Sequence, residues 1–267
     1  MEEKELPELC DNPFMVMDRI HAGENIALRC EIQRCVIYNG LSMAADGWHP
    51  FVEAAKEYLR TGEAKYEGSV LERYYKKWQP VNARDALIGI KNGTSLLEKN
   101  SPLLIHNLPW IDVLPDAALA KLCRIIDLEN KWAGHSELTY LDGYGLQGPV
   151  SNKKAKIEYD RLLGVVDSIQ KHGYKRGGDD ITVQVLKRGD NFRYLVLHGQ
   201  HRVAVMAAIE QKTIPATPLL IVDSKYVEHW PQVYKGVWSR EHALQYFNHL
   251  FDFDSKQWAR ELGLKTN

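Results

Sequence analysis

The sequence lacks a long apolar run and a surplus of charge of either sign. No stretch of about 18 consecutive apolar residues occurs, so the sequence offers no segment that would span a bilayer. Lys and Arg number 34 against 35 Asp and Glu, which excludes a uniformly basic surface that follows a phosphate backbone. A hydrophobic content of 45% and a charged content of 26% are typical of a globular chain and exclude a disordered or collagen-like one.

Cysteine is scarce and scattered, which bears on the redox compartment and on metal binding. The four cysteines are Cys10, Cys30, Cys35 and Cys123. Cys30 and Cys35 lack the short spacing of a zinc knuckle, and no second pair completes a zinc site. Residues 1–5, Met-Glu-Glu-Lys-Glu, have no apolar segment of the kind that a secretory signal carries. We therefore expect reduced thiols and a cytoplasmic protein with no structural metal.

Charge is distributed unevenly along the chain. Residues 1–140 carry 16 basic and 21 acidic side chains, residues 141–223 carry 12 and 9, and residues 224–267 carry 6 and 5. The same divisions mark changes in the pattern of residues. We predict a mostly helical N-terminal domain over 1–140, a mixed core over 141–223, and a helical C-terminal extension over 224–267 that packs on the core.

Cap residues and apolar spacing predict several helices before residue 140. Residues 50–59 have apolar side chains at helical spacing, and a following Thr-Gly pair ends that helix. Ser69 is expected to cap a second helix and Asn82 a short third one. Asp116 is expected to cap a longer helix that reaches Ile126.

After residue 140 the pattern changes from helices alone to helices mixed with strands. Two segments that alternate apolar and polar residues are separated by a Gly-Asp turn, which predicts a β-hairpin. The expected elements are, in order, a helix over 151–172 capped by Ser151, strands over 181–186 and 192–197, a helix over 203–209, an extended segment over 213–222 and a long helix that opens at Ser239. This order predicts an α+β fold with a small mixed sheet.

A glycine-rich loop, Gly143-x-Gly145-x-x-Gly148, precedes the first helix of this core. It has the spacing of a dinucleotide-binding motif, but that motif needs a strand before it and a helix that opens inside it. Here Pro149 follows the third glycine and the next helix leads into a hairpin, so we reject a Rossmann fold. A loop that covers a bound nucleotide stays open as an alternative. The chain also lacks the G-x-x-x-x-G-K-[ST] motif of P-loop enzymes.

The segment His198-Gly199-Gln200-His201-Arg202 stands between a strand and an apolar helix. The start of a helix leaves backbone N–H groups unpaired and carries a partial positive charge. A glycine there allows close approach of a phosphate, which Arg202 can bind with two N–H groups. A cation in the first helical turn is otherwise unfavourable, which favours an anionic partner. A strand-to-helix turn whose arginine pairs with a nearby carboxylate explains the pattern equally well.

The stretch from Asp160 to Val222 resembles the ParB/sulfiredoxin superfamily. It has a helix, a strand hairpin, the turn "HGQHRVAVMAAI" and then "KTIPA", in the order of that family. The family pattern of a glycine, a variable residue and His-Arg at the helix start matches Gly199, Gln200, His201 and Arg202. The resemblance covers roughly a quarter of the chain. It implies a ParB/sulfiredoxin-like sheet whose turn binds nucleotide phosphates, with His198 beside them.

Branches of this superfamily differ in chemistry. Sulfiredoxins carry a cysteine where this chain has Gln200, so sulfiredoxin activity is not expected. Only about 45 residues follow Val222, too few for the DNA-binding module of chromosome-partitioning ParB proteins. The turn is closest to that of the ParB-fold free-serine kinases. The resemblance therefore implies a small-molecule kinase that uses ATP or ADP, with CTP as a further candidate, together with Mg²⁺.

Phosphoryl transfer also needs groups that orient the acceptor hydroxyl, such as that of a sugar or amino acid. Glu158 is the candidate base, because its helix flanks the phosphate turn in this fold, and His201 is a second candidate catalytic residue. Ser151 is expected to contact phosphate or to cap its helix. Candidates for the acceptor pocket are Glu67, Ser69 and Arg240, each of which also suits a helix end or an exposed face.

Two other functions fit the same residues. One is a nucleotide-sensing regulator or a DNA-binding protein without kinase activity, supported by the basic excess of residues 141–223. The other is a ParB-like scaffold that binds no nucleotide. The favoured expectation is a nucleotide-dependent phosphotransferase with a small-molecule substrate and no nucleic acid. Residues 1–140 would then determine acceptor specificity.

Overall fold

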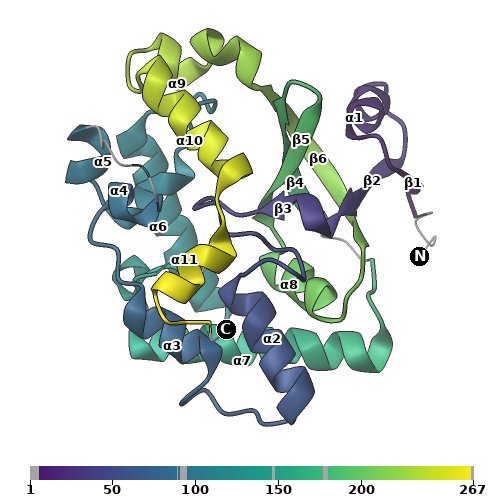
Figure 1. Ribbon diagram of the computed structural model, residues 1–267, viewed down its shortest axis with the longest axis vertical. Helices are drawn as coiled ribbons and strands as arrows, with labels where there is room; N and C mark the ends of the chain where they lie inside the picture. The colour runs from purple at the N-terminus through teal and green to yellow at the C-terminus, as the bar shows by residue number, and fades with distance from the viewer. Residues whose placement is uncertain (1–5, 89, 91–94, 146–147, 177–179, 266–267) are drawn as a thin grey trace.

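The computed structural model describes residues 6–88, 90, 95–145, 148–176 and 180–265, which form a mixed sheet covered by helices on both faces (Figure 1). The six strands lie in the order β1-β2-β6-β4-β5-β3. Their bounds are β1 Glu8–Cys10, β2 Ile26–Glu31, β3 Cys35–Val36, β4 Ile181–Arg188, β5 Asn191–His198 and β6 Thr213–Asp223. The α+β class predicted from the sequence is thereby confirmed.

The strands β4, β5 and β6 of the sheet come from the segment in which the sequence predicted strands. β4 and β5 form the expected antiparallel hairpin, which closes where Arg188 pairs with Asn191. β6 then lies parallel to β4 on the other side, after the crossover through the helix that follows β5. β4 and β5 extend slightly further into the turn than the alternation of apolar and polar residues predicts, because their backbones continue to pair there.

Three strands come from the beginning of the chain, where we expected helices and irregular connections. β1 pairs parallel with β2, β2 pairs antiparallel with β6, and the two-residue β3 pairs parallel with β5. The sheet therefore draws strands from both sides of the expected boundary at residue 140. These strands are only two to six residues long. Such short strands carry little periodicity of their own, and their pairing partners lie far away in the sequence.

The helices account for most of the remaining chain. Their bounds are α1 Pro13–His21, α2 Pro50–Thr61, α3 Val70–Lys77, α4 Ala83–Ala86, α5 Ser95–Lys99, α6 Pro115–Trp132, α7 Asn152–His172, α8 Gln200–Ala208, α9 Pro231–Tyr234, α10 Arg240–Asp252 and α11 Ser255–Glu261, with short 3₁₀ turns η1 Ile32–Arg34, η2 Pro102–His106, η3 Tyr140–Asp142 and η4 Ser224–His229. Within the described residues, none of these helices is both long and apolar enough to cross a membrane.

Most of the predicted caps are observed. Ser69, Asn82, Ser151 and Ser239 each accept a hydrogen bond from a backbone N–H in the first turn of the helix that follows. Asp116 was expected to cap α6, but that helix begins one residue earlier at Pro115, with Leu114 at the cap position. Proline at the first helical position needs no N–H partner, and this permits the earlier start.

The two faces of the sheet bury two separate hydrophobic clusters. Along β5, Tyr194 and Val196 belong to the cluster beneath α2, α7 and α8, whereas Leu195 belongs to the cluster beneath α10 and η2. Alternate residues of a strand point to opposite faces, so both faces are covered. The aromatic C-terminal segment contributes to both clusters: Tyr246, Phe247 and Phe251 of α10 belong to the second, and Trp258 of α11 belongs to the first.

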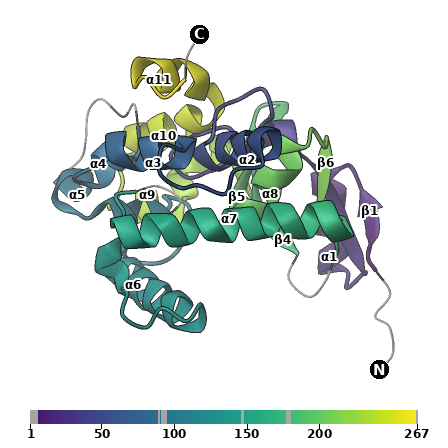
Figure 2. The same ribbon diagram turned by 90° about the horizontal axis from the view of Figure 1, so that it is seen from below.

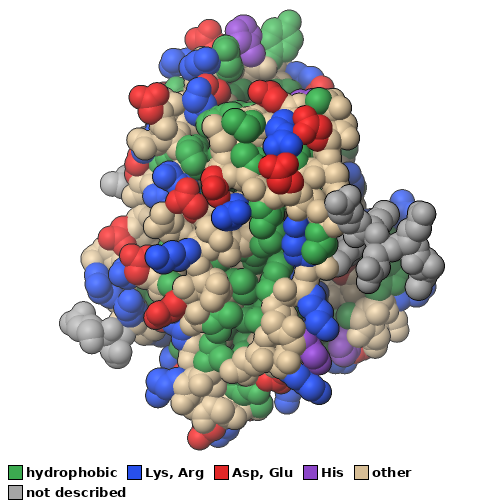
Figure 3. Space-filling model, turned by 90° about the vertical axis from the view of Figure 1, so that its right-hand side faces the viewer, with side chains coloured by type: hydrophobic (Ala, Val, Ile, Leu, Met, Phe, Trp, Pro, Cys, Tyr) green, Lys and Arg blue, Asp and Glu red, His purple; other side chains and the backbone are tan. Residues whose placement is uncertain are grey.

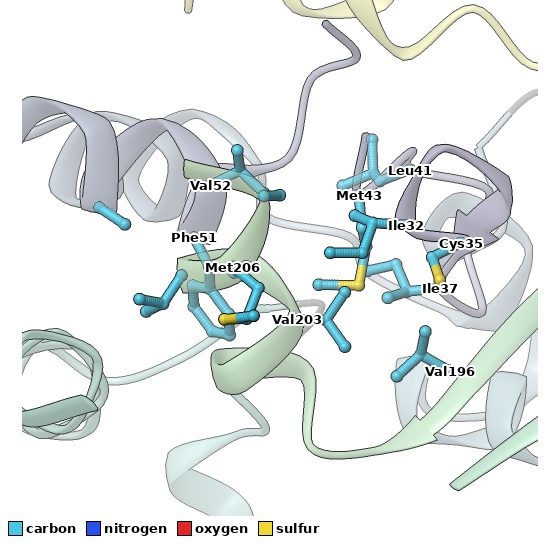
Figure 4. Packing of buried hydrophobic residues seen from close by; sticks show 14 of the residues in the cluster. Ile32, Cys35, Ile37, Leu41, Met43, Phe51, Val52, Val196, Val203 and Met206 are labelled. Atoms are coloured by element: carbon cyan, nitrogen blue, oxygen red, sulfur yellow. The ribbon is translucent and has the colours of Figure 1, made fainter. Parts of the chain in front are cut away.

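Helix α8 packs between the sheet and α2 (Figure 4). Met206 lies beside Phe51 of α2, whereas Val203 points toward Ile37 and Met43 in the segment that follows β3. Seen from below, α7 runs across the molecule, with α2 and α8 above it and α6 below its N-terminal end (Figure 2). The beginning of α8 is therefore placed against α7 and close to the end of α6.

Candidate functional site

The segment 198–202 forms a sharp turn from β5 into α8. Gly199 is the residue before the helix and has φ +88°, ψ 20°, in the left-handed region that favours glycine. A Cβ at this position would lie 2.8 Å from Cγ1 of Ile181 and 3.1 Å from Nη2 of Arg202. The helix begins at Gln200, one residue before the His201-Arg202 pair expected in its first turn, and no side chain caps its N-terminus. Its first N–H groups are therefore available to a ligand.

A cavity of about 260 Å³ lies at this helix start. Its walls come from α6, from the glycine loop before α7, from α7, and from the turn into α8. The lining residues are Glu129, Tyr144, Gly145, Glu158, Arg161, Val165, His198, Gly199, Gln200, His201 and Arg202. The cavity thus brings together the helix start and the candidate base that the sequence predicted, although more than 40 residues separate Glu158 from Arg202.

Glu158 is the centre of a charged network in this cavity. Its Oε1 lies 3.1 Å from Nζ of Lys154 and 3.2 Å from Nη1 of Arg161, and its Oε2 lies 3.4 Å from Nε2 of His201. Lys154 also donates a hydrogen bond of 2.6 Å to Oδ1 of Asn130 in α6. Lys154 and Glu158 are both almost completely buried, so their charges compensate each other inside the protein.

The ion pairs control the protonation of Glu158. Burial opposes ionisation of the carboxyl, but His201, Arg161 and Lys154 together outweigh it and lower the pKa of Glu158 to about 2. Glu158 is therefore ionised at neutral pH. A lowered pKa makes the carboxylate a weaker proton acceptor, and its contacts also place it to position His201 and Arg161.

His201 is held by an aromatic contact. Its ring stacks on Phe51 of α2, with centroids 4.6 Å apart and an interplanar angle of 16°. The 3.4 Å contact of its Nε2 with Glu158 is an ion-pair distance that lacks hydrogen-bond alignment. The buried His49, whose ring also contacts Phe51, accepts the Phe51 N–H at Nδ1 and thereby caps α2. Burial, together with the charge of His201, lowers the pKa of His49 to about 3.

The glycine loop closes over Glu158. A Cβ at Gly145 would lie 2.4 Å from Cγ of Glu158, so only glycine fits there. The Gly145 carbonyl accepts a hydrogen bond from the hydroxyl of Tyr75. Burial, followed by the charge of Glu158, raises the pKa of Tyr75, which keeps this donor protonated. Gly145 thus serves close packing around a carboxylate, whereas Gly143 packs against the backbone of Pro149. Leu146 and Gln147 lie outside the described residues.

Arg202 folds back along the turn. Its guanidinium lies beside Gly199, as the 3.1 Å distance to a Cβ built there shows. It also lies close to the hydroxyl of Tyr174. Burial raises the pKa of this hydroxyl, and Arg202 lowers it in part. Arg202 therefore stands at the rim of the cavity, next to the uncapped N–H groups of α8.

The structure places the remaining predicted site residues as follows. His198 is exposed at the cavity edge, whereas the buried Gln200 side chain turns away and donates to the carbonyls of Val196 and Leu197. Ser151 caps α7 and does not line the cavity.

The three candidates for the acceptor pocket lie elsewhere. Ser69 caps α3, Glu67 is exposed just before it, and Arg240 pairs with Glu228 at 3.2 Å near the start of α10. None of the three lines the cavity at α8.

Two charged residues of the cavity were missed by the reading of the sequence. Arg161 lies three positions after Glu158 on α7, a spacing that places both on one helix face and could have revealed it. Glu129 comes from α6, and its carboxylate forms no ion pair with any residue that the structure describes. No sequence signal connects Glu129 to the turn at 198–202, because only the packing of α6 against α7 brings it there.

Two further features of the molecule bear on the site. A larger cavity of about 720 Å³ lies between α3 and α11, but it contains none of the predicted site residues. Within the described ranges, no group of three His, Cys, Asp or Glu side chains is arranged to hold a metal ion. Comparisons with family models, with curated proteins and with solved structures found no match to this chain.

Proposed function

We propose that this protein is a nucleotide-dependent phosphotransferase whose phosphate site is the N-terminus of α8. The observation that carries the proposal is an uncapped helix start, preceded by a glycine with positive φ, that opens into a cavity with two arginines. Backbone N–H groups and guanidinium groups are the donors that bind phosphate oxygens in proteins.

The charge balance of the cavity supports an anionic ligand. Lys154 and Glu158 neutralise each other within the protein. Arg161, which pairs with Glu158, and Arg202 line the cavity beside the partial positive charge of the helix start, and Glu129 is the other carboxylate among the lining residues. The side chain of Arg161 is about half exposed, so it can turn toward an incoming phosphate without exposing buried surface.

Magnesium fits this arrangement through the nucleotide itself. Mg²⁺ is commonly held by substrate phosphates and one or two carboxylates and keeps several water ligands. Glu129 is the carboxylate of the cavity that is available for this role, since Glu158 already pairs with Lys154 and Arg161 and contacts His201. When bound, the ion would neutralise charge on the transferred phosphoryl group.

The protein's own residues would then position the reactants. Phosphoryl transfer through a loose transition state needs alignment and charge stabilisation more than a strong base. Glu158 would orient His201 and Arg161, and the exposed His198 would meet the acceptor hydroxyl at the cavity edge. A ParB/sulfiredoxin-like core is part of this proposal. It is supported by the order hairpin, phosphate turn, helix α8 and strand β6.

The test is nucleotide binding by calorimetry with Mg²⁺ present, using ATP, ADP and CTP. We expect Arg202→Ala to lower affinity about tenfold or more, because it removes a charge-assisted contact. Arg240→Ala removes an arginine remote from the cavity, also next to a helix start, and should leave affinity unchanged. Equal affinities of both variants and the natural protein, or no binding of any nucleotide, would contradict the proposal.

A nucleotide-binding regulator without transfer activity is the second candidate. The low pKa of Glu158 favours it, because the candidate base is then a weak proton acceptor. Binding without phosphoryl transfer to any sugar or amino acid would support this candidate. DNA binding has less support, because basic and acidic side chains are interspersed on the face shown in Figure 3. Binding to duplex DNA that weakens as the salt concentration rises would instead favour a DNA-binding protein.

A further inference from the structure

A polar cavity of about 500 Å³ lies beside the β4–β5 hairpin, at the other end of β5 from the site at α8. Its walls come from η1, from the loop before α2, from the hairpin and from α10. The lining residues are Gln33, Arg34, Asp46, Arg188, Asn191, Phe192, Arg193 and Phe251. None of them lines the cavity at α8, and the rise of a strand places Phe192 about 20 Å from His198 along β5. The cavity is therefore a separate candidate site.

The cavity lies at an edge of β5 that strand pairing leaves open. The outer neighbour of β5 is β3, which is only two residues long and does not reach residues 191–193. Arg34 of η1 lies against this edge instead. Its guanidinium carbon is 4.3 Å from the ring centroid of Phe192, its Nη1 donates a 3.3 Å hydrogen bond to the Phe192 carbonyl, and its Nε is 3.2 Å from Oε1 of Glu31. These contacts leave Nη2 of Arg34 as a donor without a partner among the described residues.

A second arginine of the cavity, Arg188, is fixed by the same kinds of contact. Its guanidinium carbon is 4.4 Å from the ring centroid of Phe251, and it donates 2.6 Å hydrogen bonds to both carboxylate oxygens of Asp252. The charge of Arg188 is thereby compensated, as that of Arg34 is by its glutamate. Asp46 is the single carboxylate among the lining residues, is exposed, and forms no ion pair with any residue that the structure describes.

The third arginine, Arg193, has no acidic partner. Its Nη2 donates a 3.0 Å hydrogen bond to the carbonyl of Phe251, and it forms no ion pair within the described part of the chain. Its Nε and Nη1 have no partner there, and neither is among the buried polar atoms that lack one, so both are accessible to solvent. Burial and then the charge of Arg188 lower the pKa of Arg193, while Asp252 opposes this shift and Arg34 adds to it. Arg193 is thus a half-buried cation beside two others, with donors that await an acceptor.

We propose that this cavity binds a small molecule through its carboxylate or phosphate group, with Arg193 and Arg34 as the residues that bind the anion. Guanidinium groups donate charge-assisted hydrogen bonds to the oxygens of both groups. The volume of the cavity is in the range of sites for small molecules. The rings and carbonyls that fix the arginines also reduce the entropy lost on binding. The site is independent of the function proposed above.

Calorimetry with inorganic phosphate and with succinate, at constant ionic strength, tests the proposal. All measurements use the full chain with Arg202→Ala, so that the site at α8 contributes less to the binding of phosphate. We expect at least one of the two anions to bind. Adding Arg193→Gln should lower its affinity about tenfold or more, because this removes a charge-assisted contact. Arg34→Gln, a change in a more exposed side chain at the sheet edge, should lower it as well.

Arg29 provides a matched control. It lies on β2 of the same sheet, is 3.5 Å from Asp11, and lines neither this cavity nor the one at α8. Arg29→Gln removes the same charge from the protein and should leave the affinity unchanged. Urea denaturation shows which variants fold. If Arg193→Gln does not fold, the comparison of Arg34→Gln with Arg29→Gln decides.

The two anions distinguish the chemistry of the ligand. An affinity that depends on Arg193 and Arg34 for phosphate alone supports a phosphate site, for succinate alone a carboxylate site, and for both a site that accepts either group. Equal affinities in Arg193→Gln, Arg34→Gln and Arg29→Gln overturn the proposal. Absence of binding of both anions to the Arg202→Ala protein also overturns it, and leaves the proposal for α8 to its own test with nucleotides.

Discussion

The carboxylate of Glu158 lies 3.1 Å from the ammonium group of Lys154, and the two side chains are only 6% and 4% exposed. They occupy positions i and i+4 of α7, so the pair is built into one helix before any tertiary contact forms. The pair stands behind the proposed phosphate site, where it fixes the charge that Arg161 and His201 face.

Removing one member of this pair should destabilise the protein strongly. Lys154→Met leaves Glu158 buried without its closest cation and should cost about 3 kcal/mol, as broken buried pairs do. The double variant Lys154→Met with Glu158→Gln removes both charges and should recover much of that loss. Urea denaturation measures both. A double variant less stable than Lys154→Met would show that the pair is not coupled in this way.

The glycine loop gives a second test. Gly145→Ala places a Cβ within 2.4 Å of Glu158 Cγ and should cost about 1–3 kcal/mol, as overpacking of a core does. It should also weaken nucleotide binding, because Glu158 must move. Gly164 lies in the exposed part of α7 with no atom within 4 Å of its Cβ position. Gly164→Ala should therefore stabilise the helix by about 0.5–1 kcal/mol. Equal effects of the two substitutions would argue against the packing described here.

The free energy of unfolding should fall as the pH is lowered, because Glu158 takes up a proton. Its folded pKa of about 2 lies below the ordinary value of 4.5, so the folded state favours the ionised form. The resulting stability is present above pH 4.5 and is lost as pH falls toward 2. Glu158→Gln should thus be less stable than the natural protein at pH 7, by a margin that shrinks between pH 5 and pH 2, as urea titrations at several pH values would show. A pH-independent margin would contradict the assignment.

His49 should contribute a second step at higher pH. Burial lowers its pKa from 6.5 to about 3, so the unfolded chain takes up a proton below pH 6.5 while the folded protein does not. That contribution to stability is present above pH 6.5 and declines toward pH 3. His49→Asn keeps an acceptor that can cap α2 and removes the titration. It should flatten the pH dependence in this range, and a His49 ring resonance that shifts near pH 6.5 in NMR titrations would refute the prediction.

Substitution of Ser69 tests whether this residue acts as a helix cap or as a substrate contact. Its Oγ accepts the N–H of Glu72 at 3.2 Å, so Ser69→Ala should cost about 1 kcal/mol of stability. Because Ser69 lies outside the cavity, nucleotide affinity and transfer rate should not change. Glu67→Ala, an exposed neighbour, should alter neither property. Loss of activity without loss of stability in Ser69→Ala would restore the acceptor role predicted from the sequence.

Local signals in the sequence predicted much of the fold. The caps at Ser69, Asn82, Ser151 and Ser239 were identified because capping depends on one side chain and the next three residues. The hairpin of β4 and β5 was identified from alternation and a turn. The start of α8 lies at Gln200, one residue before the His201-Arg202 pair expected in its first turn, with Gly199 at the cap position.

The candidate site was predictable in part for the same reason. The phosphate turn is contiguous in sequence, and Glu158 followed from the helix expected beside it. Glu129 was not predictable, since it is an ordinary polar residue that packing alone brings to the cavity at the start of α8.

The sequence by itself determined the helix caps, the hairpin and the glycine turn, because these depend on interactions between residues a few positions apart. Only the tertiary structure decided that β1–β3 complete the sheet and that α6 meets α7 at the start of α8. It also decided the environment of Glu158, because packing buries its carboxyl and brings His201 within 3.4 Å of it, whereas Lys154 and Arg161 are neighbours on the same helix.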